Sequence, residues 1–474
     1  MVSPLIVWFR NDLRITDNPA LFEAAKTGQP LILVYILDTQ DARPMGSASL
    51  YWLHHSLTAL AQDIKALGGE LLFRRGAAQE VLETLISDTS ADTVMWNRRY
   101  EKQGRESDSA LKARLKEKGL TVKSYNANLL TEPWDIEKKT GGYYKVFTPY
   151  WRAARAYISE NEHKVEPLAA PEKLDSLTSV ETLSLEDLAL LPTKPDWGSK
   201  MDAFWTPGSK GAHQALSKFL DGSVENYPDD RNRPDKEDGT SKLSPHLAFG
   251  EISPREIRKA SHACELNTET FMSEVGWREF SYVLLYHNPD LPTANFKSEF
   301  DKFEWEDNAE GLRRWQTGNT GYPFVDAGMR ELWATGWQHN RVRMVTASFL
   351  IKHLLIHWNR GEEWFWDTLV DADTASNSAS WQWVAGSGAD ASPYFRIFNP
   401  FTQGEKFDPE GDYVRKYIPE IAKLPNKYIH RPWDAPKHVL AQAGVKLGET
   451  YPNPIVDHKT AREKALSAYK QSRE

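Results

Sequence analysis

The sequence is poor in cysteine and has no long hydrophobic run. Cys264 is the only cysteine in 474 residues, which excludes an intrachain disulfide and any zinc or iron–sulfur site built from cysteines. The longest apolar runs, such as residues 30–37, are too short to cross a bilayer. The N-terminus also lacks the basic segment and the cleavage site of a secretory signal. We therefore expect a cytoplasmic protein that makes no contact with a membrane.

Common nucleotide and metal motifs are missing or incomplete. The chain contains no G-x-x-x-x-G-K-[ST] sequence, which excludes a P-loop. Residues 386–391 have the glycine spacing of a dinucleotide fingerprint, but no predicted strand precedes them. His353 and His357 lie four residues apart, as zinc ligands can, yet no third ligand follows at a known spacing. We predict a structural role for this pair and no bound metal.

The charge balance is acidic and the aromatic content is high. A net charge of −8 argues against a protein that is basic all over, although a local basic face is enough to bind nucleic acid. The chain has 18 tryptophans, and ten of them lie between Trp277 and Trp383. Some of these indoles fill a helical core. The others are candidates for stacking or for electron transfer.

The first part of the chain predicts an α/β domain with a parallel, Rossmann-like sheet. Short apolar segments alternate with amphipathic helical segments, which is the pattern of βαβ units. The five predicted strands are residues 5–10, 31–37, 70–76, 92–100 and 120–126. We assign residues 1–130 to this domain.

The rest of the chain predicts a connection followed by an all-α domain. Residues 131–205 are punctuated by proline and have irregular periodicity, so we interpret them as a long linker with short helices. After this linker, helical spacing dominates and strand patterns nearly vanish. We assign residues 206–474 to a helical domain, which contains most of the tryptophans.

Several polar motifs in the helical half are candidate sites. Thr240, Ser241 and Ser244 supply hydroxyls just before a predicted helix, which suits either an anion site or ordinary capping. Two predicted helix faces mix polar, charged and aromatic residues, which suits a recognition surface better than a core. These faces are Glu274, Trp277, Arg278 and Ser281, and Trp337, Asn340, Arg341 and Met344. The segment 371–377 adds Asp371, Asp373 and Asn377, which could accept hydrogen bonds from a ligand or an arginine.

Long motifs along almost the entire chain resemble those of the photolyase and cryptochrome family. They occur in the same order as in the family, from "WFRNDLRITDNPAL" through "GTSKLSPHLAFGEISPR", "EVGWREF" and "TGYPFVDAGMRELWATGWQHNRVRM" to "DADTASNSASWQWVAGSGADASPYFRIFNPFTQGEKFDPEGDYV". Within the family, the sequence is most similar to bacterial cyclobutane pyrimidine dimer photolyases. The resemblance implies a lyase that splits these dimers in DNA by light-driven electron transfer from reduced FAD.

The resemblance also implies where FAD binds. Tyr227 and the segment 240–244 hold the diphosphate side. Arg343 pairs with Asp371 beside the flavin ring, and Asn377 faces flavin N5. The full implied set of FAD contacts is Tyr227, Thr240, Ser241, Lys242, Leu243, Ser244, Phe271, Arg278, Trp337, Asn340, Arg343, Asp371, Ala372, Asp373 and Asn377.

Further residues match family positions for repair and for flavin reduction. Glu274 and Asn340 hydrogen-bond the dimerised bases, and Trp277 and Trp383 pack on them. The implied lesion and DNA contacts are Glu274, Trp277, Arg278, Ser281, Asn340, Arg341, Met344, Trp383 and Gln403. The implied catalytic set is Glu274, Asn377 and a chain of indoles that carries electrons, Trp381, Trp358 and Trp305.

The resemblance implies a second chromophore and leaves its identity open. In one branch of the family a glutamate contacts folate, but Gly104 stands at that position here. The loop 100–108 is closer to relatives that use 8-hydroxy-deazaflavin, whereas the segment after Asn377 is closer to relatives that use methenyltetrahydrofolate. We favour methenyltetrahydrofolate. The expected partner is UV-damaged DNA with its lesion flipped out, bound by a monomer that acts at the bacterial nucleoid.

Two other activities occur in the same family. A cryptochrome-type photoreceptor is less favoured, because plant cryptochromes have aspartate at the position of Asn377 and lack the pocket partner Trp383. Photolyases of (6-4) photoproducts use a histidine pair where His339 and Asn340 stand here. A light-independent DNA-binding module is least favoured, because the implied flavin site is intact.

Overall fold

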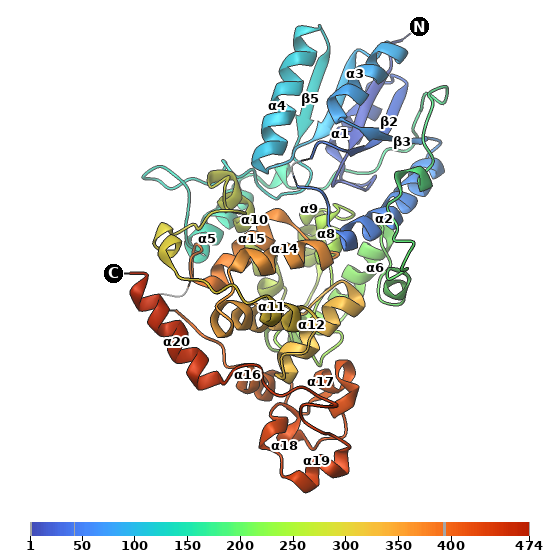
Figure 1. Cartoon of the computed structure of the whole chain (residues 1–474). Helices are drawn as coiled ribbons and strands as arrows, with labels where there is room; N and C mark the ends of the chain where they lie inside the picture. The colour runs from blue at the N-terminus through green and yellow to red at the C-terminus, as the bar shows by residue number, and fades with distance from the viewer. Residues whose placement is uncertain (1, 42, 392–394, 474) are drawn as a thin grey trace. The chain divides into compact units, whose positions relative to one another are not determined.

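The chain folds into two compact units, each built from several segments. The computed structural model describes residues 2–41, 43–391 and 395–473 (Figure 1). Unit 1 comprises Met1–Asp221, Ser241–Pro289 and Val370–Asp373, and unit 2 comprises Gly222–Thr240, Asp290–Leu369 and Thr374–Glu474. The domain boundaries that we place at residues 130 and 205 stay a prediction.

Unit 1 contains a five-stranded parallel sheet with the strand order β3-β2-β1-β4-β5. Its strands are β1 (Leu5–Phe9), β2 (Leu31–Asp38), β3 (Leu71–Gly76), β4 (Thr93–Asn97) and β5 (Thr121–Tyr125). Each lies within two residues of its predicted range except at the end of β4, where the chain leaves the sheet at Asn97. The central strands are buried on both faces, which explains their nearly continuous apolar sequences. The predicted fold class is confirmed.

Helices alternate with the strands and cover the sheet (Figure 1). They are α1 (Pro19–Ala25), α2 (Ser47–Ala66), α3 (Ala78–Thr89) and α4 (Lys102–Glu117). Leu82 and Leu85 of α3 and Leu111 and Leu115 of α4 join Ile6, Trp8, Ile32, Val34, Leu72, Val94 and Trp96 in one buried cluster. This cluster forms the core of the α/β part.

The segment predicted as a linker packs along the sheet of unit 1. It contains α5 (Phe147–Glu160) and the 3-10 helices Glu162–Lys164, Glu186–Leu188 and Ser199–Ala203. Leu177 N–H donates to Leu31 O, and Leu183 N–H donates to Phe73 O of the edge strand β3. A covered edge strand cannot recruit another chain, so these bonds protect the sheet.

Unit 1 also contains α6 (Ser209–Leu220), α8 (Ser244–Ala248), α9 (Pro254–Ala263) and α10 (Glu269–His287). Helix α9 begins with a capping box between Ser253 and Glu256. The start of the predicted linker is tied to α10, because Leu130 and Thr131 N–H donate to Glu279 at 2.8 and 3.3 Å.

All regular elements in the described residues of unit 2 are helices, apart from one isolated β-bridge between Leu447 and Tyr451. Its longer helices are α11 (Ala309–Gln316), α12 (Pro323–Thr335), α13 (Asn340–Ser348), α14 (Trp358–Thr368), α15 (Thr374–Ala385), α16 (Pro400–Phe407) and α20 (His458–Gln471). Short elements complete it: α7 (Tyr227–Asp230), α17 (Asp412–Tyr417), α18 (Asn426–Ile429) and α19 (Lys437–Ala443), together with the 3-10 helices Ser223–Asn226, Ser298–Lys302, Pro419–Ile421 and Pro432–Asp434. Within the described ranges of both units, no helix is long and apolar enough to span a membrane.

One predicted helix is interrupted in the structure. The helical spacing of residues 337–361 belongs to α13, to a single π-helical turn at Phe349–His353 and to α14. Trp337 lies before α13, because His339 caps that helix and accepts the Arg341 N–H on Nδ1 at 3.2 Å. The prediction that Trp337 shares a helix face with Asn340, Arg341 and Met344 is therefore wrong. Histidine is not among the usual N-cap residues, so the start of α13 at Asn340 could not be predicted from a capping signal.

Candidate functional site

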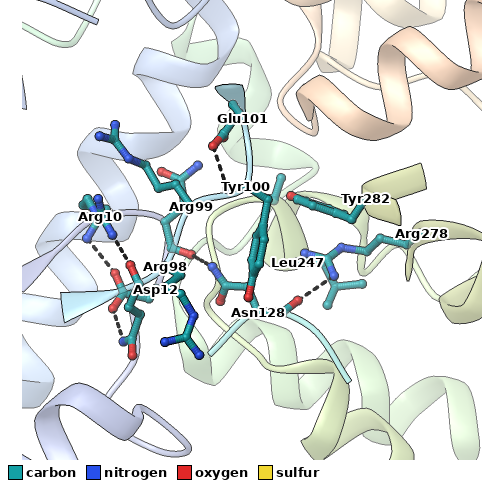
Figure 2. Close-up of a pocket in the computed structure, with 13 residues that line it drawn as sticks. Arg10, Asp12, Arg98, Arg99, Tyr100, Glu101, Asn128, Leu247, Arg278 and Tyr282 are labelled. Carbon is teal, nitrogen blue, oxygen red and sulfur yellow. Dashed lines mark hydrogen bonds between the residues drawn. The ribbon is translucent and has the colours of Figure 1, made fainter. Parts of the chain in front are cut away.

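A polar pocket lies in unit 1 where the strand order reverses. The chain leaves β1 and β4 in adjacent positions of the sheet and continues in opposite directions from them. Crevices at such switch points, beyond the carboxyl ends of the strands, are the usual ligand sites of open α/β sheets. The pocket residues, most of which are labelled in Figure 2, are Arg10, Asn11, Asp12, Asn97, Arg98, Arg99, Tyr100, Glu101, Asn128, Leu247, Ala248, Arg278 and Tyr282.

Buried ion pairs hold one wall of this pocket. Asp108 accepts from Arg10 at 2.6 Å and from Arg99 at 2.8 Å. Burial disfavours the charged form of Asp108, but the two guanidinium groups outweigh it and hold the pKa of this carboxyl below its usual range. Burial lowers the pKa of Arg10, which also donates to the Asn97 carbonyl. The wall is fixed before any ligand arrives.

The opposite wall is aromatic and carries a second acid. Tyr100 and Tyr282 pack edge to face, with ring centroids 5.8 Å apart (Figure 2). Burial raises the pKa of Glu101, although Arg99 opposes this shift. Arg278 Nη1 donates to Asn128 O at 2.7 Å. Rings, guanidinium groups and a carboxyl group together suit a flat ligand that has several polar edge atoms.

The predicted recognition face of α10 divides between different neighbours within unit 1. The Trp277 ring stacks on Phe147 of α5, with centroids 3.9 Å apart and planes 10° from parallel. Arg278 belongs to the pocket. Ser281 is buried, and its hydroxyl donates a hydrogen bond to Trp277 O. Glu274 is half-buried. The stacking on Phe147 therefore holds the Trp277 ring in one orientation.

Other predicted flavin contacts of unit 1 are placed in two segments. Ser241 to Ser244 lead into the short helix α8, and Lys242 has the left-handed φ of 54°. Phe271 is buried against Phe219, 4.8 Å away. Asp371 is buried, Ala372 is half-buried, and Asp373 accepts from the Tyr282 hydroxyl. Tyr282 thus connects the pocket with a predicted flavin contact.

In unit 2, helix α15 presents Asn377, Trp381 and Trp383 to different surroundings. The Asn377 amide is buried and donates to Glu362 O at 3.1 Å and to Glu362 Oε1 at 2.8 Å. Trp381 packs against Trp315 and Phe365. Trp383 is half-buried, and its Nε1 donates to Asp390 O at 3.1 Å.

The three predicted electron-transfer indoles differ in burial. Trp381 fits over Gly361 of α14, where a Cβ would lie 2.1 Å from its Cη2 atom. Trp358 opens α14, is fully buried and donates to Asn295 Oδ1 at 2.9 Å. Trp305 is half-buried and packs on Phe303 at 4.4 Å. Trp381 and Trp358 are thus more deeply buried than Trp305.

The remaining predicted residues of unit 2 have separate partners. Arg343 Nε donates to Gln338 O at 2.6 Å, and Arg341 contacts Asn232 and the Phe407 ring. Tyr227 is buried under Arg231. Asn340 is exposed, Trp337 is buried, and Thr240, Met344 and Gln403 are half-buried. The functional roles of all these residues stay predictions.

Two family models match most of the chain. The model of the DNA photolyase domain matches residues 5–172, and the FAD-binding domain of DNA photolyase matches residues 271–471. The chain belongs to the DNA photolyase family. The family assignment made from the sequence motifs is thereby confirmed.

Curated relatives in the photolyase family cover the chain almost completely. It is 52% identical to a deoxyribodipyrimidine photo-lyase of Agrobacterium fabrum over 98% of each chain. It is 37% identical to cryptochrome-2 of Arabidopsis thaliana over 100% of this chain and 80% of that protein. A crystal structure of a class III photolyase from Agrobacterium tumefaciens matches with a TM-score of 0.96 and 51% identity, over 100% of this chain and 98% of that one.

The residues present fit the FAD that the photolyase family model describes. In unit 1, the hydroxyls of Ser241 and Ser244 and the ammonium group of Lys242 suit a diphosphate, and the carboxylate of Asp373 suits the polar edge of a flavin. In unit 2, the Asn377 amide and the Arg343 guanidinium also suit a polar edge. Within the described ranges, the buried Ser378 hydroxyl beside Asn377 has no hydrogen-bond partner. A polar group of a ligand could satisfy it.

Sequence reasoning missed several neighbours of the predicted photolyase residues. Glu362 lies fifteen residues before Asn377 and contacts it only through the packing of α14 on α15. Phe147 lies in the segment predicted as a linker, where no periodic pattern drew attention to it. His357, considered only as a metal ligand, contacts Trp305 and Trp358. Glu362 and Phe147 were missed because their partners are distant in sequence. His357 was missed because it was considered only as a possible metal ligand.

Proposed function

We propose that this protein splits cyclobutane pyrimidine dimers in DNA, using blue light and FAD. The observation that carries the proposal is the division of α15, which bears an amide, a packed indole and a half-exposed indole within seven residues. The family relationship supports the reaction class, because photolyases are among its members over the full length of the chain.

The protein's own residues would bind and orient the lesion. The dimer has to leave the base stack to be reached, and photolyases are themselves a standard example of base flipping. Trp277 and Trp383 would stack on the flipped bases, a contact worth about 1–3 kcal/mol per base. The stacking of Phe147 on Trp277 supports this role, because it holds the Trp277 ring in one orientation.

Polar residues would then manage charge and protons. When bound, reduced FAD would supply the light-driven transfer of one electron to and from the dimer. Glu274 would hydrogen-bond a base carbonyl and offer it a proton, and Asn340 would bind the neighbouring base. Arg341 and Gln403 would contact the DNA backbone, since guanidinium and amide groups bind phosphate oxygens.

The indoles would restore the reduced state of the flavin. Trp381, Trp358 and Trp305 would pass electrons inward when oxidised protein is illuminated. The decrease in burial from the first two indoles to Trp305 supports this direction, because the outermost indole needs access to a reductant.

The test is illumination of the purified, reduced protein with DNA that contains cyclobutane dimers. We expect the dimers to disappear. Retention of the dimers by protein that has bound FAD would refute the proposal, and loss of (6-4) photoproducts instead would support the second photolyase type. The cryptochrome relative makes a photoreceptor the second candidate, which predicts light-induced flavin reduction without repair.

The electron route has its own test. Trp381→Phe should slow photoreduction of oxidised FAD by roughly tenfold or more, which corresponds to about 1.4 kcal/mol in the barrier. Repair by chemically reduced Trp381→Phe protein should continue. Unchanged photoreduction would show that electrons enter elsewhere.

We also propose that the pocket at β1 and β4 receives the second chromophore, with methenyltetrahydrofolate favoured over 8-hydroxy-deazaflavin. Its edge-to-face tyrosines offer an aromatic surface to a pterin ring, and its guanidinium groups offer partners to the carboxylates of a folate. The absorption spectrum of purified protein discriminates the two, because folate absorbs near the ultraviolet edge and deazaflavin in the blue. Glu101→Gln should weaken retention of the chromophore and leave FAD content unchanged.

A further inference from the structure

His357 lies between two of the indoles in unit 2. Its ring centroid is 4.9 Å from that of Trp305, with the planes at 66°, and 5.5 Å from that of Trp358, with the planes at 28°. The imidazole therefore packs edge to face with one indole and nearly parallel to the other. Nothing in the proposed repair reaction uses this histidine.

The backbone fixes the orientation of this imidazole. His357 is the N-cap of α14, and its Nδ1 accepts the Asn359 N–H at 3.1 Å. Because Nδ1 is an acceptor, the neutral ring carries its proton on Nε2. The Trp358 ring is held as well, by its 2.9 Å hydrogen bond to Asn295. The two rings thus keep a fixed mutual geometry.

The surroundings favour the neutral form of the imidazole. Burial lowers the pKa of His357, and this effect outweighs the opposing attraction of Glu363 on the same helix. The positive end of the α14 dipole acts in the same direction as burial. Two acids near the indoles have other partners, since Glu306 pairs with Lys464 and Asp301 accepts from Asn295 at 2.7 Å.

We propose that His357 is a positioning residue that holds Trp305 beside Trp358 and has to remain uncharged for an electron to pass between them. The inference rests on the proposed electron route. In this step one electron moves from Trp305 to the oxidised Trp358, which becomes neutral, while Trp305 becomes a radical cation. An added thiol then returns an electron to Trp305. An imidazolium beside Trp305 would repel the positive charge that forms there.

Two substitutions separate the role of the ring from the role of the cap. His357→Phe keeps a ring of similar size but removes both the titration and the Nδ1 acceptor. His357→Asn removes the ring but keeps an oxygen that can cap α14, because asparagine is among the preferred N-cap residues. FAD content and repair by chemically reduced protein serve as checks that both variants fold.

The experiment measures photoreduction of oxidised FAD with excess thiol between about pH 5.5 and 8.5, a range centred near the histidine pKa. We expect the native protein to slow on acidification, His357→Phe to be independent of pH, and His357→Asn to be slower by roughly tenfold at every pH. Trp381→Phe is the control for the route. If it photoreduces normally, the proposed function's electron route fails. If it is blocked while both His357 variants match the native protein at every pH, only this inference fails.

A second readout does not depend on photochemistry. The His357 ring resonance, assigned by its absence from both variants, can be followed by NMR during a pH titration of the FAD-bound protein in the dark. We expect a midpoint below about 6.5, the usual histidine value. A midpoint above that value would place a charge beside Trp305 at neutral pH and would overturn the proposal.

Discussion

The pocket of unit 1 and the tryptophan cluster of unit 2, which comprises Trp381, Trp358 and Trp305, are lined by different kinds of side chain. The pocket has buried charges in pairs, with Arg10 and Arg99 both bonded to Asp108. The neighbours of Trp381, Trp358 and Trp305 are rings, a glycine and an amide. One region is organised by electrostatics and the other by shape.

This difference matches what each region is proposed to do. Fixed charges orient a polar ligand without reorganising when it binds. A hole that moves through indoles has the opposite requirement, because each nearby charge would shift the energy of one indole relative to the next. The contrast predicts that charge removal is costly in the pocket and that charge insertion is costly beside the indoles.

The largest expected effect comes from breaking the pocket's ion pairs. Asp108→Ala leaves Arg10 buried without its partner, and such losses typically cost about 3–5 kcal/mol. We expect a decrease of this size in the free energy of unfolding, measured by urea denaturation. Glu23→Ala is the matched control, because the Glu23–Lys26 pair is 40% and 58% exposed and exposed pairs contribute about 0–1 kcal/mol. Equal effects of the two substitutions would contradict the comparison.

The strands of unit 1, the unit that contains the charged pocket, were predicted well from the sequence. The strands of unit 1 were predictable because their residues are apolar almost without interruption and turn signals bound them. The pocket itself was not predicted, because its walls come from the ends of strands, from α8 and from α10. No local pattern reports that segments so distant in sequence meet.

A second prediction concerns Glu279, whose carboxylate lies beside the pocket residue Arg278. Burial raises the pKa of Glu279 to about 7, despite the attraction of Arg278 and the two backbone donors. The folded state therefore binds this proton more tightly than the unfolded state, so stability falls as the pH rises from about 4.5 to 7.

Glu279→Gln removes this titration and keeps an acceptor for Leu130 and Thr131. We expect the native protein to lose about 3 kcal/mol relative to the variant over this pH range, because each pKa unit corresponds to about 1.4 kcal/mol. Urea midpoints measured at several pH values provide the check. Parallel stability curves for the two proteins would mean that Glu279 is ionised throughout.

The candidate site in the helical unit was only partly predictable. Asn377, Trp381 and Trp383 were singled out by their sequence motif, and all three lie on helix α15. The contact of Glu362 with Asn377 and that of His357 with Trp305 were not predicted, because tertiary packing decides which side chains meet. The helix face that included Trp337 was wrong because a histidine cap, invisible to periodicity, starts α13 at Asn340.

The smallest expected effect comes from inserting a carboxylate at Asn377, on the same helix as Trp381. Asn377→Asp replaces a buried donor with a carboxylate that faces Glu362 Oε1, the atom now 2.8 Å from Nδ2. A buried group that loses its partner typically costs about 1–3 kcal/mol. Burial and the facing acid would raise the pKa of the new carboxyl, so the loss should be smaller at pH 5 than at pH 8.

A double variant that combines Asn377→Asp with Glu362→Gln shows whether the two side chains interact. An amide at that position can donate to the new carboxylate, so the double variant should recover part of the stability that Asn377→Asp loses at pH 8. The coupling between the two sites, obtained from all four proteins by urea denaturation, should be about 0.5–3 kcal/mol. Additive losses would mean that the two side chains do not act on each other. The cost of a charge in this region would then arise from desolvation alone. Burial, and not the kind of side chain that surrounds the indoles, would then be what disfavours charges near them.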